Sequence, residues 1–293
     1  MEPPLKKYPA EYFGFPYTER TKEIEELRAK QHCPFLDVEC KKPRKSQPEV
    51  KIGVCTLGYR PDFSKNFHPV IICSYRFQVP SVFEAIEKNY LPNSKSADLV
   101  WVPEVSIGVG GSVDYVLAKR NKLDEFICVE TQAAGTTGTP WEAVQEYRKT
   151  GTFSRESYGV GINWANEFVK TMMQQAYKKG LIVESWRKKI VFALQDIGLE
   201  YMNKNNDTGG LHDPKDEDPI HFCIFKMVWS DAKKRWDPIF QRRMSTDTDG
   251  VRRILGGAPE GAFLSSSDFV ENVRKTMKKK GIGVSDKKQV LLS

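Results

Sequence analysis

Two short apolar runs of this chain each carry a carboxylate where an apolar side chain would bury most comfortably. Residues 111–117 contain Asp114, and residues 126–132 contain Glu130 followed two positions later by Gln132. Side chains two apart on a strand leave the same face, so Glu130 and Gln132 should emerge together. If the runs pair as neighbouring strands, Asp114 and Glu130 can converge on one Mg²⁺, which also takes waters and a phosphate. The pattern indicates a minimal phosphodiester-cleaving site, although the spacing is equally compatible with an edge hairpin whose acids are solvated.

A second group of chemically active residues lies before these runs. Four of the six cysteines fall within residues 33–73, namely Cys33, Cys40, Cys55 and Cys73. Four thiolates suit Zn²⁺ or iron in a tetrahedral shell, and a small segment without a strong hydrophobic core often needs a metal to fold. The spacing is not the paired CxxC pattern, so a scatter of buried small hydrophobic residues is the alternative. His32 and His68 could replace one cysteine ligand.

Composition places the chain among ordinary globular proteins. Its 293 residues are 40% hydrophobic and 28% charged, which excludes a disordered or fibrous chain. The net charge of +7 fits an acidic polymer partner such as nucleic acid without requiring one. No apolar run approaches the length of about 20 residues that spans a bilayer, and the N-terminus lacks the apolar core of a secretory signal. We therefore expect no membrane partner, an intracellular location and reduced cysteines.

The elements that must position these residues form an alternating series. Strands are expected over residues 99–107, 112–118, 126–132, 189–195 and 222–229, and helices over 18–31, 80–92, 141–149, 163–179 and 268–279. Gly180 is expected to cap the fourth helix, and residues 203–219 are expected to form a long loop. This order predicts an α/β fold with a mixed central sheet flanked by helices. A boundary near residue 78 would separate an N-terminal arm and cysteine module (1–77) from a larger domain (78–293).

The order of these features resembles the NotI family of type II restriction endonucleases over roughly residues 30–200. The resemblance rests on the cysteine-bearing module, Val102-Pro103-Glu104-Val105, Gly111-Ser112-Val113-Asp114-Tyr115 and Val129-Glu130-Thr131-Gln132. That family belongs to the PD-(D/E)XK nuclease class, in a variant where Gln replaces the usual Lys. Here Val113 departs from the class motif by standing where a proline precedes the first Asp.

The resemblance implies a PD-(D/E)XK nuclease core plus a small N-terminal metal-binding module. Asp114 and Glu130 would bind Mg²⁺, and Gln132 would occupy the Lys position. The four cysteines Cys33, Cys40, Cys55 and Cys73 would hold a structural iron, with zinc as the alternative metal.

The expected chemistry is attack by a metal-activated water on the scissile phosphate. The Gln132 amide does not titrate, so we expect it to orient the water rather than accept its proton. The Thr131 carbonyl is a candidate further ligand. Glu104 would hold a second ion or a metal-bound water, unless it is a solvated strand end.

The resemblance also implies a substrate and partners. The enzyme would cut double-stranded DNA at a GC-rich palindrome of the CGGCCG type, leaving 5′-phosphate and 3′-hydroxyl ends. It would act as a homodimer, because a palindrome matches two-fold symmetry, and would share a prokaryotic cytoplasm with a cognate DNA methyltransferase. Candidate guanine readers are Arg242, Arg243, Arg252 and Arg253, which flank an expected Ser/Thr/Asp/Gly loop. For each of them a phosphate contact or a solvated charge is the alternative. The alternatives are a non-catalytic DNA-binding protein built on a metal module, and a structure-specific repair nuclease of the same class.

Overall fold

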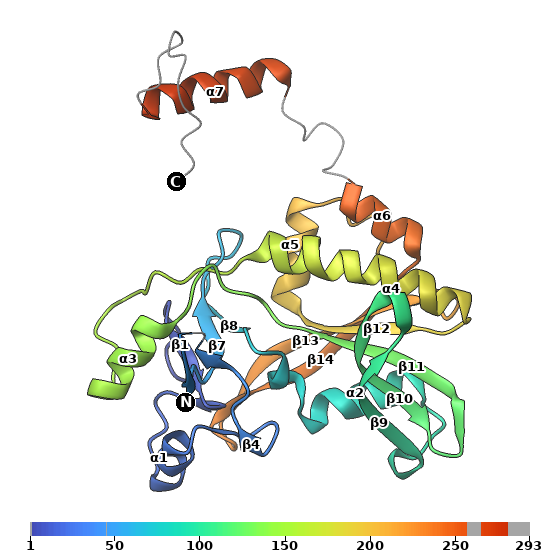
Figure 1. The fold of residues 1–293 in the computed structure, drawn as a ribbon, viewed down its shortest axis with the longest axis horizontal. Coiled ribbons are helices and arrows are strands. Elements are labelled where there is room, and N and C mark those ends of the chain that lie inside the picture. Colours follow the sequence, from blue (N-terminus) through green and yellow to red (C-terminus); the bar gives the residue numbers. More distant parts are fainter. Residues whose placement is uncertain (1, 45, 257–264, 281–293) are drawn as a thin grey trace. The chain divides into compact units, whose positions relative to one another are not determined.

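The long apolar runs of the chain form one six-stranded mixed sheet in the order β14-β13-β12-β11-β10-β9 (Figure 1). The computed structural model describes residues 2–44, 46–256 and 265–280. The strands are β9 (Leu99–Ser106), β10 (Ser112–Lys119), β11 (Lys122–Gln132), β12 (Ile190–Gln195), β13 (Ile220–Ser230) and β14 (Arg235–Thr246). Strands β9, β10 and β11 form an antiparallel meander, whereas β11, β12 and β13 run parallel and β14 returns antiparallel. The predicted α/β class with a mixed sheet is confirmed.

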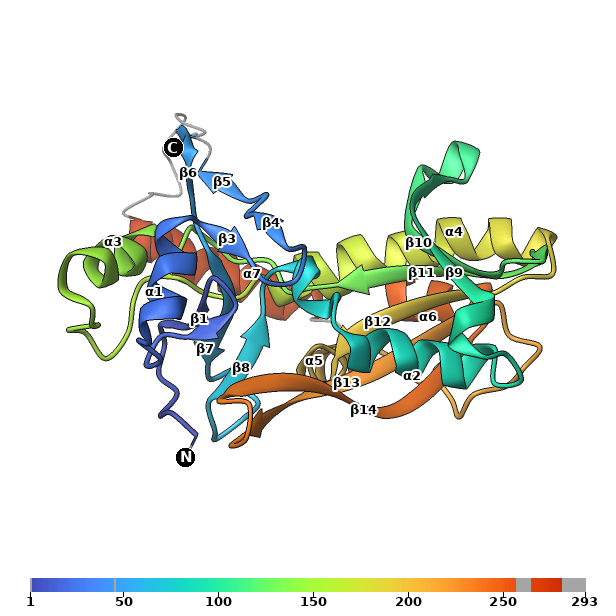
Figure 2. The same ribbon diagram turned by 90° about the horizontal axis from the view of Figure 1, so that it is seen from below.

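Helices cover both faces of this sheet, and Figure 2 shows α4 and α2 on opposite sides of it. One face packs against the π-helical segment η4 (Ala165–Met173) and against α4 (Gln174–Ser185), α5 (Asp196–Asn205) and α6 (Thr248–Gly256). The other face packs against α2 (Pro80–Tyr90), whose Val82 and Ile86 join the second core cluster. All six residues of β12 are buried, as expected for a nearly unbroken apolar strand in a central position.

A smaller sheet, β2-β1-β7-β8, lies beside the large one in the same unit. Its strands are β1 (Pro9–Tyr12), β2 (Phe15–Pro16), β7 (Val54–Tyr59) and β8 (His68–Ile71). Around it are helices α1 (Lys22–Ala29) and α3 (Trp141–Thr150), and the two-stranded ribbons β3 (His32–Cys33) with β4 (Val38–Glu39) and β5 (Pro43–Arg44) with β6 (Gln47–Lys51). Short 3-10 helices are η1 (Ser74–Phe77), η2 (Ser96–Asp98) and η3 (Gly108–Gly110).

Buried polar contacts join the two sheets. Glu11 on β1 pairs with Arg76 on η1, and Arg76 also donates to the Trp236 carbonyl on β14. The side chain of Gln195, at the end of β12, accepts from the Ile71 backbone and donates to the Pro69 carbonyl. The end of the small sheet is thereby tied to the centre of the large one.

Residues Met1–Gly256 form one compact unit and Gly257–Ser293 a second. The predicted boundary near residue 78 falls within the first unit, between η1 and α2. The described part of the second unit is Ser265 and α7 (Ser266–Lys280), which is close to the predicted helix over 268–279. Residues 257–264 and 281–293 of the predicted larger domain lie outside the described residues.

Three local predictions were wrong. Gly180 does not end its helix, because α4 continues to Ser185; the glycine instead lets the helix approach β13, where an added Cβ would lie 2.5 Å from Cδ1 of Ile220. Helix α5 extends to Asn205, so the loop predicted from residue 203 begins later. The Ser/Thr/Asp/Gly segment between the candidate arginines, predicted as a loop, instead forms the end of β14 and the start of α6.

Candidate functional site

The two predicted acids meet where β10 and β11 separate. Pairing of these strands ends at Tyr115 opposite Val129, one residue short of Asp114 on β10 and one residue short of Glu130 on β11. Beyond this point β11 stays paired with β12, whereas β10 stays paired with β9. This separation of β10 from β11, called the fork below, leaves backbone groups of both strands outside the β10–β11 ladder. The two acids therefore lie where the sheet opens.

Thr131 fixes the carboxylate of Asp114. Oδ2 of Asp114 accepts hydrogen bonds from the backbone N–H of Thr131 and from its hydroxyl, both at 2.8 Å. The first of these replaces a ladder bond that is lost at the fork. Among the described residues, Oδ1 of Asp114 accepts no hydrogen bond, which leaves one carboxylate oxygen for a cation.

Glu130 is a buried acid, with 7% of its surface exposed. Its side chain shares the α4-covered face of the sheet, and Oε1 accepts from Nζ of Lys179 at 2.5 Å. Burial, followed by the negative charge of Asp114, raises the pKa of Glu130 to about 7, and the bond and charge of Lys179 oppose this shift. A buried carboxylate whose ionisation is opposed by a neighbouring acid is a common feature of a cation-binding site.

Lys179 is the residue that sequence reasoning missed. It was predicted to lie on a helix, but no role was assigned to it. Its position gave a signal, because Met172, Ala176 and Val183 are spaced as one buried helical stripe that Lys179 shares. A lysine on such a stripe requires a buried partner, and here that partner is Glu130.

The remaining predicted catalytic residues lie around the same fork. Gln132 is half-buried on the same face of β11 as Glu130, and its amide donates to the Ala133 carbonyl at 2.9 Å. Glu104 is exposed on β9 and has a left-handed backbone conformation (φ 53°), which a non-glycine residue adopts at some cost. A cavity of about 460 Å³ is lined by both Glu104 and Asp114, together with Thr131 and Lys41. Both Gln132 and Glu104 therefore stay candidates.

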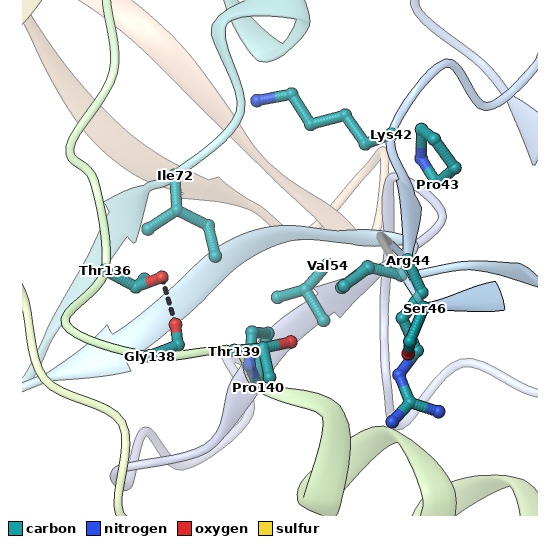
Figure 3. Close-up of a pocket in the computed structure, with 11 residues that line it drawn as sticks. Lys42, Pro43, Arg44, Ser46, Val54, Ile72, Thr136, Gly138, Thr139 and Pro140 are labelled. Atoms are coloured by element: carbon teal, nitrogen blue, oxygen red, sulfur yellow. Dashed lines mark hydrogen bonds between the residues drawn. The ribbon is translucent and has the colours of Figure 1, made fainter. Parts of the chain in front are cut away.

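A second cavity, of about 640 Å³, begins a few residues after Gln132 (Figure 3). The loop carrying Thr136 and Thr139 forms one wall, and Lys42 and Arg44 stand across from it, with Ile72 and Val54 between them. The Thr136 hydroxyl donates to the Gly138 carbonyl at 2.5 Å, which fixes the turn of the loop. The cavity therefore combines an apolar floor with a basic rim close to the end of the candidate catalytic strand.

The four predicted metal-binding cysteines come from different elements but share one neighbourhood. Cys33, Cys40, Cys55 and Cys73 are all buried. Burial raises the pKa of the Cys40 thiol, and the nearby Cys73 and Cys33 raise it further; Cys55 responds in the same way to burial, Cys73 and Cys40. Backbone N–H groups of Lys42 and Gly53 act on Cys40, and those of Tyr75 and Arg76 act on Cys73, in the direction that stabilises thiolates.

This donor set fits a thiolate-binding metal in chemistry and burial. Within residues 2–44, 46–256 and 265–280, however, no three side chains of His, Cys, Asp or Glu already form a group that could hold a metal ion. The four thiols are thus close enough to influence one another but are not arranged as a finished coordination shell. The metal module stays a prediction.

The structure does not bring the predicted DNA-reading arginines to the fork. Arg242 lies in the same cross-strand row as Gln132, through Leu194 and Ile224, but three strands away, a lateral distance of about 14 Å. Arg243 donates to the Asn89 carbonyl at 2.8 Å and packs over a tyrosine ring of α2. On α6, Arg252 pairs with Asp249, and Arg253 is exposed. Their role in base reading stays a prediction.

Among the described residues, no helix has the length and apolar character needed to cross a membrane. The sequence matches no protein-family model, and no curated protein matches it significantly.

Proposed function

We propose that this protein is a Mg²⁺-dependent endonuclease with a PD-(D/E)XK core, acting on double-stranded DNA as a type II restriction enzyme. The observation that carries the proposal is that Asp114 and Glu130 are the first residues beyond the last β10–β11 pair, near enough for the charge of Asp114 to act on Glu130. The ammonium group of Lys179 balances one of the two carboxylates, and the second negative charge is costly to the fold unless a further cation neutralises it. The mixed sheet with helices on both faces supports the assignment of the core.

The chain's own residues have distinct roles in this proposal. Asp114 and Glu130 would hold the metal, and Thr131 binds Oδ2 of Asp114, which leaves Oδ1 without a hydrogen bond from the described residues. Bound Mg²⁺ supplies Lewis-acid stabilisation of phosphate charge and a more acidic water. Gln132, on the same face as Glu130, has an amide that can orient a water molecule but cannot take its proton.

Charge and shape near the fork support a nucleic-acid substrate. The chain carries a net charge of +7, and the cavity that follows the catalytic strand has Lys42 and Arg44 on its rim. Phosphate groups are the natural partners of such side chains, and the small residues of the loop around Gly138 allow a backbone to approach closely.

Several finer properties belong to the same proposal. We propose a two-fold homodimer that cuts a GC-rich palindrome of the CGGCCG type and works beside a cognate methyltransferase in a prokaryotic cytoplasm. The four buried cysteines would hold iron, or zinc in its place, as a structural metal. Metal analysis of the purified protein should give about one iron or zinc per chain, and Cys55→Ser should lower that content and the melting temperature together. A metal-free protein of unchanged stability would exclude the metal module.

The test of the catalytic proposal is digestion of phage DNA in the presence of Mg²⁺. The wild-type protein should give discrete bands, and Asp114→Ala and Glu130→Ala should abolish cleavage while DNA binding stays measurable. Asp124→Asn is the matched control, because this exposed acid lies on the same strand as Glu130 and should not matter.

Each other outcome of the digestion contradicts the proposal in a defined way. Robust cleavage by either alanine variant would remove the two acids from the mechanism. No cleavage by the wild-type protein would favour a non-catalytic DNA-binding protein. Cutting confined to junctions or flaps would favour a repair nuclease of the same class.

A further inference from the structure

Lys179 is a buried cation at the candidate metal site, and its ammonium group donates hydrogen bonds to other acceptors besides the carboxylate that balances its charge. Only 6% of its surface is exposed. Its Nζ donates to Oε1 of Glu130 at 2.5 Å, to the Ser112 carbonyl at 2.8 Å and to Oε1 of Gln175 at 3.2 Å. An ammonium group has three N–H donors, and here each has an acceptor.

These three acceptors lie on the three elements that meet at the fork. Ser112 begins β10, two residues before Asp114; Glu130 lies near the end of β11; and Gln175 lies one turn before Lys179 on α4. Lys179 thus ties together two strands at the point where their own ladder has ended. A change in its length or charge would alter the spacing between the strand that carries Asp114 and the strand that carries Glu130.

The helix that carries Lys179 is itself held close to the sheet. Gly180 leaves no room for a Cβ against Ile220, and Ala176 and Val183 on the same helical face are fully buried. The backbone of α4 is therefore fixed, and the position of the ammonium group follows from a packed helix rather than from a mobile side chain.

We propose that Lys179 is a positioning residue that sets the geometry of the Asp114–Glu130 pair and limits how strongly that pair attracts a divalent cation. The proposal rests on the function proposed above. Two carboxylates and one ammonium group leave a single negative charge at the fork, whereas loss of the ammonium group leaves two. A site without Lys179 should bind the cation more tightly but hold it in the wrong place.

Lys179→Met separates these two effects. Removal of a unit charge next to Glu130 should tighten Mn²⁺ binding, measured by electron paramagnetic resonance in alkaline buffer, by roughly tenfold. The rate constant of DNA cleavage at saturating metal should fall by about 100-fold, the usual consequence of misplacing a catalytic group by about 1 Å. Lys178→Met is the matched control, because it removes the same charge from the neighbouring, solvent-exposed position, and both quantities should stay at wild-type values.

Opposite shifts of metal affinity and cleavage rate distinguish positioning from a structural role, because a damaged fold weakens both. Lys179→Arg, which keeps the charge, should retain wild-type Mn²⁺ affinity and recover part of the rate. If Lys179→Met does not fold, Lys179→Arg alone must show unchanged Mn²⁺ affinity with a reduced rate.

Weaker Mn²⁺ binding by Lys179→Met, or an unchanged rate, would overturn the proposal even if the wild-type protein cuts DNA. If the wild-type protein cuts no DNA, the proposed function fails. The Mn²⁺ measurement then still decides whether Lys179 controls the cation site.

Discussion

Arg76→Met is predicted to destabilise the protein by about 3–5 kcal/mol, because it breaks a fully buried ion pair. Arg76 and Glu11 are 1% and 0% exposed. The guanidinium group binds both oxygens of Glu11, at 2.9 and 3.0 Å, and also donates to the Trp236 carbonyl. After the substitution, the Glu11 carboxylate would stay buried with the Thr56 hydroxyl as its remaining hydrogen-bond donor among the described residues.

The double variant Glu11→Leu/Arg76→Met tests the origin of that cost. It removes both charges, so the penalty for an unpaired buried carboxylate disappears. What remains is mainly the loss of the bond to Trp236, about 1 kcal/mol, and some change in packing. The double variant should therefore be more stable than Arg76→Met by about 2 kcal/mol or more.

The assay is urea unfolding followed by tryptophan fluorescence, with the free energy of unfolding extrapolated to zero urea. Because the pair joins β1 and η1 to β14, both sheets should unfold in a single transition. A cost below about 1 kcal/mol for Arg76→Met, or a double variant as unstable as the sum of its single variants, would refute the reasoning. The result matters for function, since this pair helps hold the cysteine-bearing region and the rim of the larger cavity against the large sheet.

Three further predictions concern stability. Because the pKa of Glu130 is raised to about 7, the folded metal-free protein binds more protons than the unfolded chain. Its free energy of unfolding should therefore fall by about 3 kcal/mol as the pH rises from about 4.5 to 7. The free energy of unfolding of Glu130→Gln should not show this fall. Burial lowers the pKa of His221 to about 4, so the neutral imidazole contributes about 3 kcal/mol to the stability of the fold above about pH 6.5. That stability is lost as the pH falls towards 4, and His221→Phe should not show the loss. The same dependence of stability on acid pH in both proteins would contradict this. Gly180→Ala should destabilise the protein by about 1–3 kcal/mol, despite the better helix propensity of alanine, because the added Cβ would collide with Ile220. A raised melting temperature would contradict this and would show that β13 can move to make room for the Cβ.

Alternation and apolar runs were sufficient to predict the strands that carry the site. Asp114 and Glu130 interrupt short apolar runs, and that interruption predicted both strands and indicated the two acids as candidates. The nearly unbroken run at residues 189–195 likewise predicted a central strand, because only a strand covered on both faces can bury consecutive apolar residues.

The features that the sequence did not predict depend on tertiary packing. Gly180 looked like a helix stop, but its lack of a side chain serves a close contact with Ile220 that lies 40 positions further along the chain. Strand β14 was missed because it contains Pro238 and several charged residues and is an edge strand, where such residues are tolerated. Lys179 escaped notice because a lysine on a helix is usually solvated, and only the folded chain shows that its partner is Glu130.

The most direct test of the central claim is the rate of DNA cleavage as a function of Mg²⁺ concentration for the wild-type protein and for Asp114→Asn. Asp114→Asn keeps the size of the side chain and can still accept a bond from Thr131, so it removes a charge without removing the contact. We predict Mg²⁺-dependent cleavage by the wild-type protein and none by the variant at any Mg²⁺ concentration, with both proteins binding DNA. Equal cleavage by the two proteins, or cleavage by the wild-type protein that does not depend on a divalent cation, would contradict the account.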